Sequence, residues 1–113
     1  MKVKDFGITI YDLLKKVGNK NIYVAFVEQW KKVDDMSIEE SKKRFIILTR
    51  DIDTKVKINK LENLCLAFHL LVDDKKYNDY DIVVYNEDDN EHYNIKDIAE
   101  DIENCYTIGV TNE

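Results

Sequence analysis

Four side chains that could hold a soft metal ion are spread along the 113-residue chain: Cys65, His69, His92 and Cys105. Structural zinc sites use Cys2His2 sets, and Cys65 and His69 lie about one helical turn apart. Such sites normally also contain a closely spaced cysteine pair, which this sequence lacks. We therefore expect no metal cofactor, with Cys65 as a small core residue and His69 as a partly exposed helix residue.

Two segments carry the oxygen ligands of hard cations. Residues 51–62 match a calcium-binding EF-hand loop at five of its twelve positions, but Lys55 and Val56 occupy the fifth and sixth, where an oxygen ligand and a glycine are needed. We expect a solvated connection there. The acidic turn at 87–91 offers carboxylate and amide oxygens, so weak divalent-metal binding at this turn stays an alternative.

The motifs of nucleophilic, phosphate and dinucleotide chemistry are absent from the sequence. It has no Gly-x-Ser-x-Gly elbow, no His-Glu-x-x-His helix and no phosphate-binding loop, and its three glycines are dispersed. The carboxylates at 87–91 should be exposed, and an exposed carboxylate lacks the raised pKa of a general acid. We expect a protein that is not an enzyme and that uses no cofactor.

Tyrosine is concentrated in the last third of the chain, from residue 73 onward, where five of the seven occur. Its large, stiff ring with a polar tip is enriched at interface hot spots. The alternative is that these rings face the core or pair across a hairpin. Interleaved with carboxylates, they predict a surface for a basic protein partner, formed by Tyr80, Asp81, Tyr85, Asp88, Asp89, Glu91 and Tyr93.

The charge is distributed unevenly along the chain. Residues 1–72 hold 14 Lys and Arg against 10 Asp and Glu, whereas residues 73–113 hold 3 Lys against 13 Asp and Glu. The acidic third favours a cationic partner and disfavours direct binding to nucleic acid. The basic pairs of the first part, among them Lys15–Lys16 and Lys31–Lys32, are expected on solvated helix faces.

Neither a membrane protein nor an exported protein is indicated. No stretch shows the pattern of a secretory signal, and no window approaches the roughly 18 apolar residues of a membrane span. Two cysteines far apart in such a chain are expected to be reduced thiols. We expect a cytoplasmic protein.

The elements that must position these residues follow from hydrophobic spacing. Apolar residues at i, i+3, i+4 and i+7 predict a helix over 9–17, which Gly18 can end in a left-handed conformation. A second helix is predicted over 21–33, although Ile22 and Val24 also suit a strand.

Two further helices are predicted before the acidic third. Ser37 and Glu40 form a capping box that predicts a helix over 37–51. A wide apolar face predicts a mostly buried helix over 60–72. The segment between them, 52–59, could form a short strand.

The hydrophobic period changes in the acidic third. Alternation over 80–85 and 92–95 predicts a β-hairpin with an acidic turn. Apolar residues at helical spacing predict a short helix over 95–102, and 106–110 reads as a last strand. The expected fold is therefore α+β in one domain, with helices packed on a C-terminal hairpin, short helix and strand.

The stretch Thr9-Ile-Tyr-Asp-Leu-Leu-Lys-Lys-Val17 and the acidic hairpin run from Ile82 to Ile98, followed by Ile102 to Val110, resemble small uncharacterised proteins of Gram-positive bacteria and their phages or mobile elements. The resemblance implies a biological setting and carries no functional residues. The length of the chain and the order of its expected elements predict a single domain, 1–113, with a helical part over 1–72 and an acidic ββαβ part over 73–113.

These features together predict a non-enzymatic binding protein whose acidic, tyrosine-rich surface contacts a basic protein partner. An inhibitor or immunity-type protein of a phage or mobile element is the specific form of this hypothesis. The alternatives are a protein that binds a divalent metal weakly and a structural subunit of a homo-oligomer.

Overall fold

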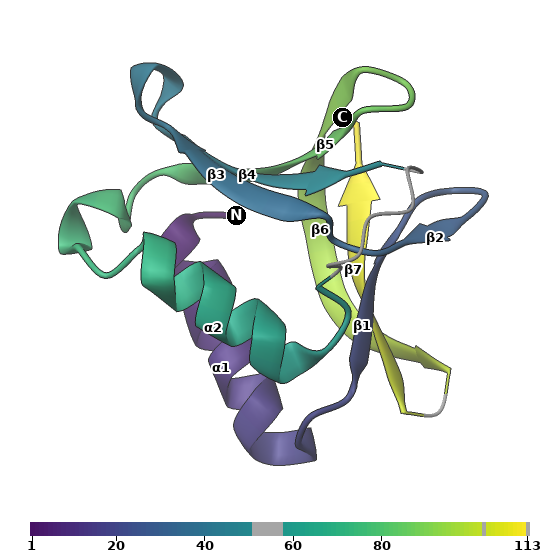
Figure 1. Cartoon of the computed structure of the whole chain (residues 1–113). Coiled ribbons are helices and arrows are strands. Elements are labelled where there is room, and N and C mark those ends of the chain that lie inside the picture. Colours follow the sequence, from purple (N-terminus) through teal and green to yellow (C-terminus); the bar gives the residue numbers. More distant parts are fainter. Residues whose placement is uncertain (51–57, 103, 113) are drawn as a thin grey trace.

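The computed structural model describes residues 1–50, 58–102 and 104–112, and it contains a sheet built from both halves of the chain (Figure 1). The strands are β1 (Asn21–Ala25), β2 (Trp30–Lys31), β3 (Asp35–Glu39), β4 (Arg44–Thr49), β5 (Asp81–Asn86), β6 (Glu91–Ile102) and β7 (Cys105–Thr111). Their order in the sheet is β2-β1-β7-β6-β5-β4-β3. Because β1–β7 and β4–β5 are parallel and the other neighbours antiparallel, the sheet is mixed.

Two helices, α1 (Val3–Val17) and α2 (Leu61–Leu71), lie side by side on one side of this sheet, at the lower left of Figure 1. They confirm the α+β class and the helices predicted over 9–17 and 60–72. The first helix starts earlier than predicted because Val3 and Phe6 continue the buried face of Ile10. It ends at Gly18, whose φ of 82° and N–H bond to the Leu14 carbonyl form the predicted glycine cap.

The core lies between the helix pair and the sheet. Phe68 of α2 joins the layers, with its ring centroid 5.2 Å from that of Phe6 on α1 and 5.1 Å from that of Phe45 on β4. All three rings are buried. Burial of each large apolar side chain contributes about 2 kcal/mol to the stability of the fold. This core therefore stabilises the sheet that contains the hairpin of β5 and β6.

The helix predicted over 21–33 is wrong, because its residues form β1 and β2. Ile22 and Val24 alternate with Tyr23 and are fully buried. Residues branched at Cβ lose side-chain freedom in a helix and pack well on a pleated surface. Here the period of two along β1 outweighs the weaker helical spacing.

The helix predicted over 37–51 is also wrong where the structure describes it, up to residue 50. Ser37 lies in the middle of β3 and starts no helix. A short 3-10 helix, η1 (Glu40–Lys42), and the left-handed residue Lys43, with φ of 51°, reverse the chain into β4. Alternate residues of β4 from Phe45 onward are buried, as expected of a strand rich in aromatic and β-branched side chains.

The short helix predicted over 95–102 is the second half of the long strand β6. A bulge follows Ile95, so that Ile95 pairs with Val110 while Ile98 pairs with Ile108. The two isoleucines therefore lie on the same face although they are three positions apart. A bulge thus produced the spacing that resembles a helix.

The predicted hairpin and the final strand over 106–110 are confirmed as β5, β6 and β7. A second 3-10 helix, η2 (Lys75–Tyr77), leads into β5. The predicted split into a helical part and a ββαβ part is wrong, since β1 to β4 belong to the same sheet as β5 to β7. The calcium-like loop and the strand considered over 52–59 fall largely on residues 51–57, outside the described residues.

Candidate functional site

Five of the predicted partner-binding residues meet at the turn between β5 and β6, which we call the hairpin tip (residues 85–93): Tyr85, Asp88, Asp89, Glu91 and Tyr93. Strand pairing sets Tyr85 opposite His92 and Val84 opposite Tyr93, and adjacent residues of a strand point to opposite faces. The Tyr85 ring therefore contacts His92 on one face of the sheet, and Tyr93 contacts Phe26 on the other, with centroids 4.7 Å and 5.1 Å apart.

A buried lysine lies beneath the hairpin tip. The side chain of Lys31, on β2, is 3% exposed, donates a hydrogen bond to Asn86 Oδ1 at 2.9 Å and forms an ion pair with Asp88. Its ammonium group also lies 5.7 Å from the centre of the Phe26 ring. The prediction that Lys31 is solvated is wrong. Because it compensates a buried charge, Asp88 is a structural residue of the tip.

Two further contacts connect the base of the tip to the rest of the sheet. The Asn86 side chain is buried, and its Oδ1 lies 3.4 Å from the Thr49 hydroxyl as well as accepting the shorter bond from Lys31. Arg50 Nε lies 2.6 Å from Asp34 Oδ2 and 3.4 Å from Glu87 Oε2. These contacts hold the turn in place.

Asp89 and Tyr93 form the polar centre of the tip. The Tyr93 hydroxyl donates to Asp89 Oδ2 at 2.5 Å, and the Glu91 N–H donates to Asp89 Oδ1 at 3.0 Å. The bond to the Asp89 carboxylate raises the pKa of Tyr93 to about 12. The phenol therefore stays neutral at physiological pH and orients the carboxylate.

A hollow of about 360 Å³ opens between the tip, the turn joining β1 to β2, and the end of β7. Its apolar wall includes Phe26, Val27 and Tyr93, and its acidic groups are Glu28 and Asp89. A concave surface with apolar walls and a few placed charges is the usual form of a ligand-binding site. This hollow suits a group that has an apolar stem and a cationic head.

The opposite face of the hairpin has a different electrostatic character. There Arg44 Nη2 lies 3.2 Å from His92 Nε2. Burial, and secondly the Arg44 guanidinium, lowers the pKa of His92 below its usual 6.5. The charge of Arg44 is itself paired, because its Nε donates to Glu39 Oε1 at 2.6 Å, and Tyr85 contacts the His92 ring.

Two of the predicted residues, Tyr80 and Asp81, lie at the far end of β5. The Tyr80 ring packs edge-on against Tyr77 at 5.2 Å, and Asp81 Oδ1 lies 2.8 Å from Lys2 Nζ. The hydrogen bond from Lys2 to Asp81 raises the pKa of the Lys2 ammonium group. Five residues of strand, about 17 Å, separate this end of β5 from Asn86, so the seven predicted residues form two groups.

The four soft metal ligands are distributed over three elements: Cys65 and His69 lie on α2, His92 on β6 and Cys105 at the start of β7. Among residues 1–50, 58–102 and 104–112, no group of three or more His, Cys, Asp or Glu residues has a geometry that could hold a metal ion. The Cys65 thiol contacts the Ile10 carbonyl at 3.6 Å, and burial raises the pKa of that thiol. A raised pKa is the opposite of what activates a cysteine nucleophile.

Sequence reasoning missed Lys31 and Phe26, which complete the site from the side of β1 and β2. Lys31 and Asn86 are 55 positions apart, so their contact depends on the fold. One signal in the sequence was usable, namely the alternating apolar pattern of β1. It predicts a strand in place of the helix over 21–33, and Phe26 and Lys31 would then lie near strand ends.

Comparison of the chain with protein-family models, with curated proteins and with solved structures finds no significant match. Within the described part of the chain, no helix combines the length and the apolar character needed to cross a membrane. The fold and the tip define an α+β protein with an acidic hollow at one end of a mixed sheet.

Proposed function

We propose that this chain is a non-enzymatic binding protein that captures a basic protein partner with the hollow at the hairpin tip. The observation that supports this most is the combination of Phe26 and Tyr93 with Asp89 and Glu28 around one hollow. A lysine or arginine of the partner would lay its aliphatic stem along the rings and its charge against the carboxylates.

The carboxylates of the tip differ in their availability to such a partner. Asp88 is engaged by the buried Lys31, and Glu87 lies near Arg50. Asp89 accepts only neutral donors, the Tyr93 hydroxyl and a backbone N–H, in the contacts given above. Asp89 is therefore the group through which the tip would best bind a cation.

In this proposal, an inhibitor or immunity-type role in a phage or mobile element would follow if the partner's basic surface were its working surface, such as the nucleic-acid groove of a nuclease. Acidic groups that enter such a groove compete with phosphate for the same cations. Matching of charge would also speed association at low salt.

The test compares Asp89→Asn with Asp101→Asn. Asp89→Asn keeps the size of the side chain and its capacity to hydrogen-bond while removing the charge in the hollow. Asp101 is exposed near the other end of β6 and is a matched control. Partners are captured from cells that produce the chain and quantified by mass spectrometry.

We expect Asp89→Asn to reduce capture of the principal basic partner about tenfold, because a hydrogen bond to a charged group is lost. Asp101→Asn should retain capture. Equal capture of every specific partner by wild type and Asp89→Asn would overturn the proposal.

A further inference from the structure

An exposed apolar strip lies on the outward side of the helix pair, the side that faces away from the sheet. Ile8 and Tyr11 on α1 and Leu66 and Leu70 on α2 are between 52% and 69% exposed. A groove of about 800 Å³ runs between the helices beside the first three of them. The helix pair lies at the lower left of Figure 1, away from the turn between β5 and β6 at the upper right.

On each helix, the apolar strip is flanked at both ends by charged residues of one sign. On α1, Lys4, Ile8, Tyr11 and Lys15 follow the spacing i, i+4, i+7 and i+11, so they share one side of the helix. Lys4 and Lys15 are exposed, and the Lys15 ammonium group lies over the Tyr11 ring at 5.0 Å. The strip on α1 is therefore apolar in the middle and cationic at both ends.

The strip on α2 is also flanked by charges, and these have the opposite sign. Glu62, Leu66 and Leu70 lie on one side of the helix, and Asp73 follows its end. Lys4 and Lys15 are eleven positions apart on α1, which is about 17 Å at helical rise. Glu62 and Asp73 have the same separation in sequence, with Asp73 two positions past the end of α2 at Leu71. Both acids are exposed, and neither they nor the two lysines take part in a salt bridge among the described residues.

The two strips run in opposite directions within the chain. The N–H of Leu61 donates to the Lys20 carbonyl and that of Glu62 to Asn19 Oδ1, which places the start of α2 beside the end of α1. Lys4 and Val72 line the opposite end of the groove. Lys15 is therefore level with Glu62, and Lys4 is level with Asp73.

We propose that the outward side of the helix pair binds a second copy of this chain, with α1 of each copy lying on α2 of the other. A two-fold axis parallel to the helices leaves each residue at the same height along the helix axis in both copies. Lys15 therefore meets Glu62 of the second copy, and Lys4 meets its Asp73. The four exposed apolar side chains of each copy are then buried together at the centre of the interface.

The charge pattern selects this arrangement over the other face-to-face dimer. A two-fold axis perpendicular to the helices would place α1 on α1 and bring lysine to lysine and acid to acid, and like charges in contact are unfavourable. Asp12 on α1 and His69 on α2 also line the groove, between the two strips. A second copy is the occupant whose charges complement both helices at once.

The test is a charge exchange measured by sedimentation velocity over a range of protein concentrations. Lys15→Glu should weaken the dimer about tenfold, because a two-fold interface contains the pair twice. Lys15→Glu combined with Glu62→Lys should restore it. Lys16→Glu makes the same change one position away, outside the strip, and should leave the dimer unchanged.

Three results would overturn the proposal: a monomer at every concentration up to the solubility limit, a dimer unaffected by Lys15→Glu, or a double variant as weak as the single one. Circular dichroism of each variant checks that the fold is native. We expect a native fold, because Lys15 and Glu62 are both exposed. Because this surface is separate from the hairpin tip, capture of the basic partner should be unaffected by Lys15→Glu.

Discussion

Neighbouring aspartates of the hairpin tip have different roles in this structure. Asp88 pairs with Lys31, whose side chain is almost fully enclosed, whereas Asp89 bonds to the exposed Tyr93 hydroxyl. The sequence could predict that these residues lie together, since they belong to one turn. It could not predict their roles, because Lys31 reaches Asp88 from a distant strand.

Asp88→Asn should therefore destabilise the fold far more than Asp89→Asn. Removing one partner of a buried pair leaves an uncompensated charge, which costs about 3–5 kcal/mol when both groups are enclosed. The Asp88 side chain is 36% exposed, so we expect about 2 kcal/mol for Asp88→Asn. For Asp89→Asn we expect about 0.5 kcal/mol or less.

Urea denaturation followed by circular dichroism measures both changes in unfolding free energy. Equal losses for the two variants would contradict a structural role specific to Asp88. The same measurement shows that Asp89→Asn is suitable for the binding test.

At the scale of elements, the helix predictions succeeded where the helical periodicity was long and failed where it was short. The two confirmed helices carry helical apolar patterns of several turns ended by clear signals, such as Gly18. Residues 21–33 and 37–51 lack such a continuous pattern, and their partners in the sheet come from 81–86 and 105–111. Propensity is a weak guide when distant pairing decides the outcome.

Lys43 marks the reversal that makes β3 and β4 a pair instead of a helix. Its φ of 51° is left-handed, which costs a residue with a Cβ about 1 kcal/mol relative to glycine. Lys43→Gly should therefore stabilise the protein by about 0.5–1 kcal/mol.

Lys42→Gly is the control, because Lys42 lies in η1 and has no positive φ. It should destabilise slightly through the extra freedom of the unfolded chain. Thermal denaturation of both variants measures the difference. A loss of stability in Lys43→Gly would contradict the importance of this turn.

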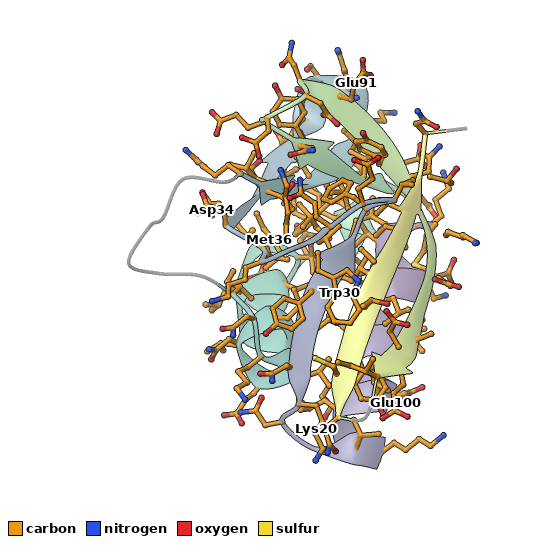
Figure 2. The ribbon with its side chains drawn as sticks, turned by 90° about the vertical axis from the view of Figure 1, so that its right-hand side faces the viewer. Lys20, Trp30, Asp34, Met36, Glu91 and Glu100 are labelled. Carbon is orange, nitrogen blue, oxygen red and sulfur yellow. The ribbon has the colours of Figure 1, made fainter. Side chains whose placement is uncertain are left out.

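At the scale of the whole molecule, the acidic residues of the last third are spread over several places, and two of these are the ends of β6. Glu91 and Glu100 lie at opposite ends of β6 in Figure 2, about 30 Å apart by strand geometry. The composition predicted an excess of negative charge but could not show this division, since a long strand replaces the expected helix. Only the tip end combines carboxylates with the aromatic hollow.

The most direct test of the proposed binding site is an NMR titration of the isotope-labelled chain with a short lysine-rich peptide at low salt. We predict the largest shift changes at Phe26, Asp89 and Tyr93, with smaller changes near Glu100, and their reduction in Asp89→Asn. Added salt should weaken the effect, because screening reduces attraction between exposed charges. Shift changes of equal size at both ends of β6, or changes that persist unaltered in Asp89→Asn, would contradict a cation-binding hollow at the hairpin tip.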